Sequence, residues 1–274
     1  MVSPVRPFGP RCPVRATCRY TADNPMVDQV ALGEVAERRV LGVPVSLLDR
    51  AQTLAAIESL LAADRQAIVV TVDASGLVIA QEDAELMAIY RGADLATPDS
   101  QGVVWALKRA GVACPERVSG VDLLDDLCRL SAEKGHRIAF VGAAPGIADL
   151  AAERMRLRHP GCNIVGTRHG FFPASDDELV AQEVAAVRPD LLFVALGIPR
   201  QEKFIERTKH IHRAKVSMGV GGSFDVFSGK ARRAPKWVQA VRLEWLYRLA
   251  QNPKKLSKVR LLPTFVRLVL REPR

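Results

Sequence analysis

Short apolar runs alternate with amphipathic segments along most of this chain, and the alternation limits the folds that it can adopt. Two of the runs, 137–141 and 190–196, are almost continuously apolar, which is typical of strands buried on both faces of a parallel sheet. Strands that alternate with helices predict βαβ units, in which helices cover the faces of the sheet. We therefore expect an α/β fold built on a mainly parallel sheet.

The expected elements follow one another in a regular order. Strand-like runs lie at 40–48, 67–72, 93–97, 137–141, 163–166, 190–196 and 215–220. Helix-like stretches lie at 51–63, 75–91, 102–110, 121–134, 147–158, 176–187 and 201–207. Ser119 and Gly135 bracket one of these helices as its expected N-cap and its glycine stop. This order predicts a Rossmann-like core.

Glycine or proline, together with polar residues, follows nearly every expected strand. Ligands of parallel sheets bind beyond the carboxyl ends of the strands, so these segments are where a site is expected. Glycine lets the backbone approach a ligand closely, and the helix N-termini that follow such turns bind phosphate. The segments concerned are 71–73, 98–102, 142–146, 166–171, 197–202 and 219–225.

Two aspartates at these strand ends have two interpretations each. Asp99 lies between Pro98 and a polar turn, where a carboxylate can act as a general base toward a hydroxyl. It is equally well placed to cap the helix expected to begin near Gln101. Asp73 presents the same alternative, with helix capping somewhat favoured.

The segments that follow the last two strands are also ambiguous. Glu202, next to Gln201, is explained by the helix dipole, which favours an acid in the first turn. The glycine-rich segment 219–225 brings backbone amides and Asp225 to the sheet edge, which suits a nucleoside. A tight turn with a capping aspartate explains Asp225 about as well.

The motifs of several familiar cofactor and metal sites are missing. The chain contains neither G-x-x-x-x-G-K-[ST] nor G-x-G-x-x-G, and no D-x-D to hold a divalent ion against a nucleotide diphosphate. Its 5 scattered cysteines form no C-x-x-C pair, which argues against a disulfide framework and a structural zinc site. His169, His210 and His212 are more typical of surface or supporting groups than of ligands or bases. We predict no metal and no cofactor.

The excess positive charge is confined to the C-terminus. Residues 230–274 hold 13 Lys or Arg against 2 acids, a net charge of +11, whereas the other 229 residues hold 26 basic and 28 acidic side chains. Aromatic and aliphatic residues are interleaved with these cations. Such a basic amphipathic segment suits an anionic membrane surface, but a solvated helix and a nucleic-acid partner are also compatible with it.

We divide the chain into three parts. Residues 1–37 are expected to be a disordered tail, residues 38–229 the α/β core, and residues 230–274 a basic, amphipathic, helical C-terminal appendage. No stretch approaches the ~18 uninterrupted apolar residues needed to span a bilayer. We expect a cytoplasmic protein that lies on a membrane and does not cross it.

Taken together, the motifs resemble one family, the TagA/WecG/CpsF bacterial glycosyltransferases, over roughly residues 38 to 262. Single motifs are weak evidence, but eight occur in the order of the family. They are T-V-D (71–73), A-T-P-D-S-Q-G-V-V-W (96–105), E-R-V-S-G-V-D-L-L (116–124), F-V-G-A-A-P-G (140–146), P-G-C-N-I-V-G-T-R-H-G-F-F (160–172), P-D-L-L-F-V-A-L-G-I-P-R-Q-E-K (189–203), G-V-G-G-S-F-D (219–225) and R-A-P-K-W with L-E-W-L-Y-R-L (233–249).

The resemblance implies an inverting, metal-independent transfer of a sugar from a UDP-sugar to a polyprenyl-diphosphate-linked sugar. In type members the donor carries N-acetylmannosamine or its uronic acid, other relatives transfer related hexoses, and the acceptor is undecaprenyl-diphosphate-GlcNAc. It also implies that the appendage closes over the active site and touches the membrane. Self-association into a homo-oligomer is known among such proteins.

Residue roles follow from the same resemblance. Asp99 matches the proposed catalytic base, and Arg248 matches an appendage cation that stabilises the leaving UDP together with Lys255 and Lys258. The remaining matches are substrate-binding positions, namely Thr71, Asp73, Gln101, Arg117, Phe171, Gln201 and Asp225. The chain departs from the pattern at Asp73, where Asn is usual, and at Ser100, where Gly is usual.

A second hypothesis is a Rossmann-like module without catalysis that binds nucleic acid through its basic tail. Asp99, Gln101 and Arg117 occur together, and aromatic residues stand beside the cations of the tail, which favours the enzyme. We therefore expect no nucleic-acid partner.

Overall fold

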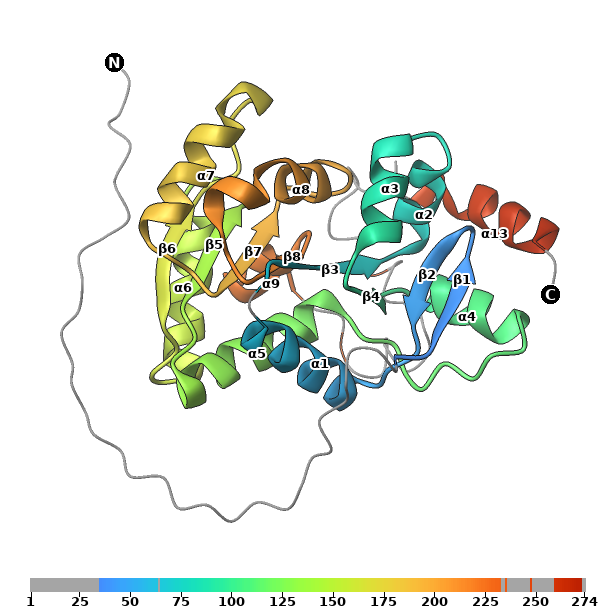
Figure 1. The fold of residues 1–274 in the computed structure, drawn as a ribbon, viewed down its shortest axis with the longest axis horizontal. Coiled ribbons are helices and arrows are strands. Elements are labelled where there is room, and N and C mark those ends of the chain that lie inside the picture. Colours follow the sequence, from blue (N-terminus) through green and yellow to red (C-terminus); the bar gives the residue numbers. More distant parts are fainter. Residues whose placement is uncertain (1–34, 64, 233–234, 236–246, 248–258, 273–274) are drawn as a thin grey trace, which may run out of the picture.

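A computed structural model describes residues 35–63, 65–232, 235, 247 and 259–272 of the chain. Within these residues, six strands form one parallel sheet in the order β4-β3-β8-β7-β5-β6 (Figure 1). The strands are β3 (Ala67–Val72), β4 (Leu95–Pro98), β5 (Ile138–Gly142), β6 (Ile164–Arg168), β7 (Leu191–Ala195) and β8 (Val216–Gly219). The predicted α/β fold with a parallel sheet is confirmed.

Helices cover both faces of the sheet, because the side chains of each buried strand alternate between two hydrophobic clusters. In β3, Ile68 and Val70 enter one cluster, whereas Val69 enters the other. The first cluster includes α2 (Ala74–Ala80), α3 (Ala84–Gly92), α4 (Gln101–Arg109), α7 (Asp177–Ala186) and α8 (Arg200–His212). The second includes α1 (Arg50–Ala62), α5 (Gly120–Lys134), α6 (Ile147–Arg158) and α9 (Ser223–Phe227). The 3-10 turn η2 (Ala174–Asp176) precedes α7.

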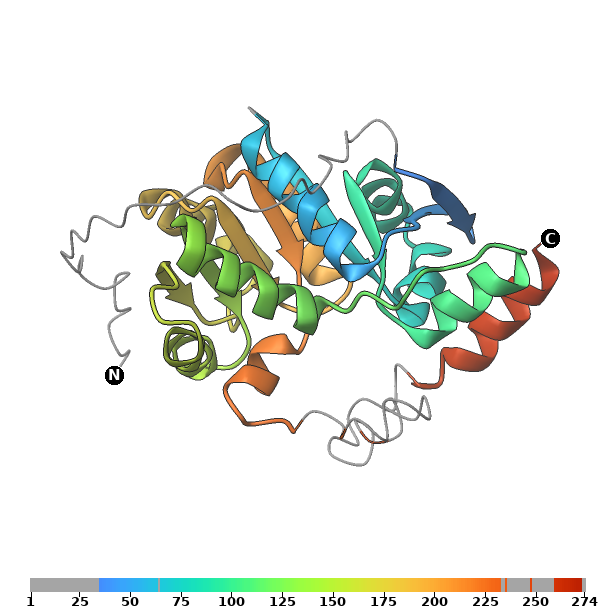
Figure 2. The same cartoon turned by 90° about the horizontal axis from the view of Figure 1, so that it is seen from below.

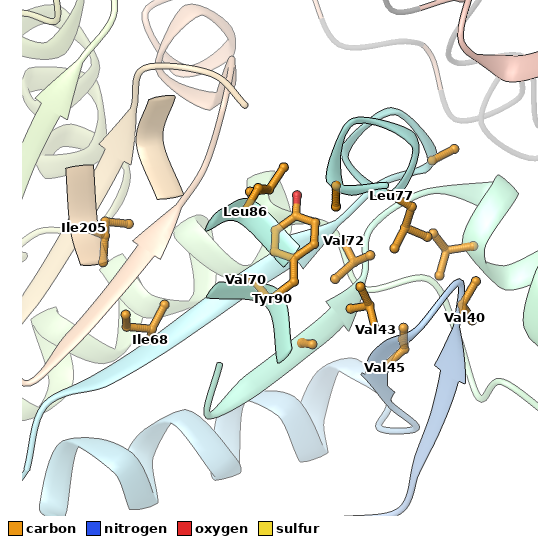
Figure 3. Packing of buried hydrophobic residues seen from close by; sticks show 14 of the residues in the cluster. Val40, Val43, Val45, Ile68, Val70, Val72, Leu77, Leu86, Tyr90 and Ile205 are labelled. Atoms are coloured by element: carbon orange, nitrogen blue, oxygen red, sulfur yellow. The ribbon is translucent and has the colours of Figure 1, made fainter. Parts of the chain in front are cut away.

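The strand predicted over 40–48 is instead a β-hairpin, and the prediction of a single strand was wrong. Strands β1 (Glu37–Val40) and β2 (Val43–Ser46) pair antiparallel, with Val40 opposite Val43. Leu41 and Gly42 both have positive φ, 50° and 83°, as a two-residue hairpin turn requires. Figure 3 shows Val40, Val43 and Val45 of the hairpin beside the sheet, where their burial anchors it.

The long helix predicted over 75–91 is two helices. Helix α2 ends at Ala80, and Asp83 begins α3 as its N-cap by accepting the N–H of Leu86 at 3.0 Å. The carboxylate offers the backbone a partner outside the helix ladder, and the helix therefore restarts there. Ser119 and Gly135 cap α5 as predicted, the glycine with φ of 78°.

Helix α13 (Leu262–Arg271) packs on the core although it lies in the predicted appendage. Phe265 and Val269 belong to the hydrophobic cluster of α2 and α4, and the Phe265 ring lies 6.4 Å from that of Trp105. Figure 2 shows α13 alongside α4. At its end, Glu272 accepts the N–H of Leu41 at 2.9 Å, which joins the helix to the hairpin turn. Among the described residues, no helix is both long and apolar enough to cross a membrane.

Candidate active site

Asp99 lies at the carboxyl edge of the sheet, directly after β4. Its main chain is held on two sides, because its N–H donates to the Val72 carbonyl at 3.0 Å and its carbonyl accepts from the Arg117 guanidinium at 3.2 Å. Val118 N–H also donates to the Pro98 carbonyl, at 3.1 Å. The segment before α5 is thereby joined to the end of β4. Asp99 itself is half-buried.

Ser100, not Asp99, is the N-cap of α4. The Ser100 hydroxyl oxygen accepts the N–H of Val103 at 3.3 Å and that of Ala74 at 3.2 Å. A single side chain thus satisfies an orphan amide in the first turn of α4 and another at the start of α2. The interpretation of Asp99 as a helix cap was therefore wrong. Ser100, which stands where the family usually has glycine, supplies the hydroxyl that makes both bonds.

Asp73 is the N-cap of α2, as the sequence favoured. Its Oδ1 accepts the Gly76 N–H at 2.6 Å and the Ser75 hydroxyl at 2.7 Å. Both bonds end on one oxygen, so an asparagine could make the same cap. Asp73 and Asp99 follow the neighbouring parallel strands β3 and β4 and therefore occupy the same edge.

Thr71 connects the neighbouring strands β3 and β8 at this edge. It is buried near the end of β3, and its hydroxyl donates to the Gly219 carbonyl of β8 at 3.1 Å. A Cβ on Gly120, at the start of α5, would lie 3.2 Å from the Thr71 methyl group, so the two segments already touch. The half-buried Gln101 and Arg117 lie on α4 and before α5, on the same side as Asp99.

Three loops meet at the ends of β5, β6 and β7. Gly142 has φ of 135°, and a Cβ there would overlap the Ala195 carbonyl. Ala143 donates its N–H to Ala195 at 2.9 Å and accepts the Gly170 N–H at 2.7 Å. From β5 the chain continues to β6 on one side of the sheet, and from β7 it continues to β8 on the other side. The neighbouring strands β5 and β7 therefore form a topological switch point, which is where parallel sheets bind ligands.

Phe171 stands beside this junction with 71% of its surface exposed. Its N–H donates to Nδ1 of His169 at 3.3 Å. Burial, and then the charge of Arg168, lower the pKa of His169 below its usual range. The next residue, Phe172, lies under the Arg200 guanidinium at 5.4 Å, and Arg200 also binds the buried Asp177. The loop is thus held from beneath while the Phe171 ring is presented to solvent.

Gln201 follows β7, in the first turn of α8, and Asp225 follows β8, in α9. The Gln201 side chain is 1% exposed and accepts from two backbone amides, those of Gly197 at 3.2 Å and Gly221 at 3.0 Å. Asp225 lies within α9, whose N-cap is Gly222, so its interpretation as a capping residue was wrong. The Asp225 carbonyl accepts from Ser228 at 3.1 Å and from Ala231 at 2.8 Å, while its side chain is half-buried.

The structure thus brings together the predicted residues of one sheet edge, from Thr71 through Asp225. Three others, Arg248, Lys255 and Lys258, lie outside the described residues. Two buried groups were not predicted as part of the site, Tyr90 and Glu202. Glu202 was explained by the helix dipole alone, and Tyr90 lay in a helical pattern that any core aromatic satisfies. The burial of Glu202 next to the buried Gln201 amide can be recognised only from the fold.

An α/β sheet with acids, amides and glycine turns gathered at its carboxyl edge is the arrangement in which proteins of this fold class bind ligands. The family model described as "Glycosyl transferase WecG/TagA/CpsF family" matches residues 38–274. The chain belongs to this family and is a glycosyltransferase.

Two relatives bear the same printed name, N-acetylglucosaminyldiphosphoundecaprenol N-acetyl-beta-D-mannosaminyltransferase. The relative in Bacillus spizizenii is 38% identical over 195 residues, which cover 71% of this chain and 75% of the relative. The relative in Bacillus subtilis is 34% identical over 206 residues, which cover 75% of this chain and 80% of the relative. The named reaction of both relatives places the sugar on a lipid-linked N-acetylglucosamine.

Proposed function

We propose that this chain transfers N-acetylmannosamine, its uronic acid or a related hexose from a UDP-sugar to a polyprenyl-diphosphate-linked sugar such as undecaprenyl-diphosphate-GlcNAc. The reaction inverts the anomeric centre, needs no metal ion, and belongs to the assembly of a cell-wall or exopolysaccharide polymer. The name that the two relatives share supports the acceptor and the N-acetylmannosaminyl group. The observation that carries the proposal is Asp99, a half-buried carboxylate on an anchored main chain at the carboxyl edge.

In the proposed reaction Asp99 is the general base. Its carboxylate takes the proton of an acceptor hydroxyl as that oxygen forms a bond to the anomeric carbon. The bond from the anomeric carbon to the UDP oxygen breaks on the opposite face, and UDP leaves with the electron pair. A single displacement of this kind inverts the anomeric centre. Arg117 keeps the main chain of Asp99 in place, and Gln101 and Thr71 lie beside it on the same edge.

The donor is proposed to lie over the junction of β5, β6 and β7. The glycine turns there let a ligand approach the backbone, and the exposed Phe171 ring offers a surface on which a uracil can stack. Asp225 would accept from a ribose or base donor. The charge that develops on UDP would be stabilised by Arg248, Lys255 and Lys258, because fixed cations near a leaving diphosphate lower the barrier.

We also propose that the protein works at the inner face of the cytoplasmic membrane, bound through its C-terminal region. Val266 and Leu270 stand one turn apart on the outer side of α13, 41% and 55% exposed. Arg267 and Arg271 are exposed directly beside them. Trp105 of α4, whose ring contacts Phe265, is 38% exposed. Cations beside an aromatic ring and aliphatic side chains suit an anionic lipid surface.

The reaction is tested by measuring UDP release from a panel of UDP-sugars, with and without a short-chain polyprenyl-diphosphate-GlcNAc, in the presence of a chelator. We expect release from one donor only, and only when the acceptor is present. Release that requires an added divalent ion would contradict metal independence. No release from any donor would contradict the proposed reaction.

Membrane binding is tested by sedimentation with vesicles that contain anionic lipid. A Val266→Ser/Leu270→Ser variant should sediment several-fold less than the unaltered protein. Leu157→Ser/Leu179→Ser is the matched control, because both leucines are exposed, on α6 and α7, and carry no proposed lipid contact. Equal losses in the two variants, or no loss in either, would contradict docking through α13.

A further inference from the structure

We infer that Gln201 and Glu202 form a positioning pair: the Gln201 amide holds together the two glycine turns after β7 and β8, and Glu202 sets the direction in which that amide points. The kinetic part of the inference rests on the proposed function, whereas its structural part does not. Gln201 then acts on the substrate through the turns, in place of the direct substrate contact that the family resemblance implied.

The first observation is the use of the Gln201 carbonyl oxygen. Oε1 accepts the N–H of Gly197, in the turn after β7, at 3.2 Å and the N–H of Gly221, in the turn after β8, at 3.0 Å. An amide oxygen has two lone pairs, and both are occupied. Because β7 and β8 are neighbours in the sheet, this single side chain bridges two adjacent loops of the active-site edge.

The second observation is the partner of the amide nitrogen. Gln201 Nε2 donates to Oε1 of Glu202 at 2.9 Å, and the two side chains are only 1% and 2% exposed. If the amide were turned over, its oxygen would face a carboxylate and its NH₂ group would face two N–H donors. Glu202 therefore fixes the orientation in which Gln201 can receive both glycine amides.

The third observation links this pair to the other half of the site. A Cβ on Gly219 would overlap Nε2 of Gln201, so the amide packs directly on the Gly219 backbone. The carbonyl of the same glycine accepts the Thr71 hydroxyl at 3.1 Å. Contacts thus run from Gln201 through Gly219 to Thr71 in β3, the strand that pairs with the one before Asp99. A shift of the amide moves both the proposed donor side and the proposed acceptor side.

Tyr90 fills the space next to this pair. It is fully buried, and its hydroxyl finds no hydrogen-bond partner among the residues that the structure describes. Burial, and then the charges of Glu202 and Asp73, raise the pKa of Tyr90 well above its usual value, so the group is a neutral hydroxyl. Figure 3 shows the ring among Leu86, Val70 and Val72. Glu202 thus faces a neutral, buried group on the side of Tyr90.

The inference is tested by reversing the hydrogen bond. Gln201→Glu keeps an acceptor for the two glycine amides but sets a second carboxylate against Glu202. The adjacent charges raise the pKa of the pair, and a proton taken up between them restores the bond. We expect kcat of Q201E to fall about 100-fold at pH 8, as a misplacement of a site by about 1 Å does, and to recover as the pH is lowered to 6.

The exchange variant Gln201→Glu/Glu202→Gln is the decisive companion. Its carboxylate at 201 again accepts from both glycine amides, and its amide at 202 donates back to that carboxylate. We expect kcat within about threefold of the unaltered protein and an unaltered pH profile, as expected when hydrogen-bond polarity is reversed without loss of a bond. A folded exchange variant as inactive as Q201E at every pH would show that the Gln201 amide meets the substrate, which would overturn the inference.

A third variant leaves both side chains unaltered. Gly219→Ala forces the amide of Gln201 to move without changing any hydrogen-bonding group. We expect a loss in kcat of about tenfold or more, again from misplacement. Full activity of G219A would also overturn the inference, even if the two charged variants failed to fold.

Hydrogen exchange separates a failure of the inference from a failure of the proposed reaction. The Gly197 and Gly221 amides should exchange about tenfold faster in Q201E than in the unaltered protein at pH 8, and at the original rate in the exchange variant, because exchange reports the hydrogen bond directly. This readout needs no substrate. Unaltered protection in Q201E would contradict the inference whether or not any sugar is transferred.

Discussion

The Arg117 guanidinium donates to the main-chain carbonyl of Asp99 across 3.2 Å. Arg117 precedes α5 and Asp99 follows β4, so the contact connects two segments at the carboxyl edge of the sheet. The backbone N–H of Asp99 is fixed from the other side by β3. The main chain of Asp99 is therefore anchored on two sides.

Asp99→Asn tests the proposed base. The amide has nearly the same shape but takes no proton, so we expect kcat to fall about 10³-fold, within the range for loss of a general base. Binding of UDP-sugar, measured by calorimetry, should change less than about threefold, because the donor is proposed to lie over other loops. Glu133→Gln, the same chemical change at an exposed carboxylate of α5, is the control and should leave both quantities unaltered. Full activity of D99N would remove Asp99 from the mechanism.

Ser100→Ala tests the shared cap. The variant leaves the N–H groups of Val103 and Ala74 without their side-chain acceptor. We expect the free energy of unfolding to fall by about 1–2 kcal/mol and Tm by about 2–8 °C. Ser59→Ala, in which only a hydroxyl bond within α1 is lost, is the control and should change stability by less than about 0.5 kcal/mol. Equal stability of the two variants would refute the cap.

The pH dependence of stability is predicted from His212. Burial lowers its pKa to about 4 in the folded protein, below the value of about 6.5 expected in the unfolded chain. Above both values the residue is neutral in either state and contributes no dependence. Between them the unfolded chain binds a proton that the folded protein does not, so the free energy of unfolding falls as pH falls. This residue accounts for at most about 3 kcal/mol of that loss.

Urea unfolding at about pH 7.5 and about pH 4.5 checks this prediction. His212→Asn retains an acceptor for the Ala214 N–H, which Nδ1 of His212 accepts at 3.1 Å, but has no group that titrates. We expect the variant to lose less stability between the two pH values than the unaltered protein does. The same loss in both would assign the acid sensitivity to other groups.

Phe265→Ala tests whether α13 is part of the core. The ring is buried against Trp105 and Gly102, although it lies in a region predicted to be an appendage. Removal of a buried phenylalanine costs about 3–5 kcal/mol. The exposed neighbour Val266→Ala should cost less than about 0.5 kcal/mol. A cost for F265A as small as that for V266A, in denaturant unfolding, would mean that α13 separates from the core in solution.

Much of the fold followed from hydrophobic patterning alone, because buried parallel strands are almost continuously apolar. The strands at 137–141 and 190–196 were therefore located within a residue of β5 and β7. The hairpin was missed since Leu41 continues an apolar run, and its positive φ is dictated by pairing across the turn. The break between α2 and α3 was missed because Asp83 interrupts no apolar periodicity and acts through one side-chain bond.

The sequence predicted which strand ends form the site, but not which contacts the individual side chains make there. The parallel order places Asp73 and Asp99 on one edge, and the sequence already indicated this. Which residue caps α4 depends on whether Asp99 or Ser100 points back at the helix, and adjacent residues cannot be distinguished by spacing. The bonds of Gln201 to two glycine turns depend on β8 lying next to β7, which no local pattern reports.

The position of β8 has a consequence for the order in which this protein can assemble. Of the strands that the structure describes, it comes last in the sequence, yet it lies in the middle of the sheet, between β3 and β7. Until residues 216–219 have been synthesised, β3 and β4 can pair only with each other, and β5, β6 and β7 form a separate unit. Long-range pairings of this kind form late and slowly. The two halves of the active site, joined by Thr71 and Gly219, therefore do not exist together in any nascent chain that stops short of β8.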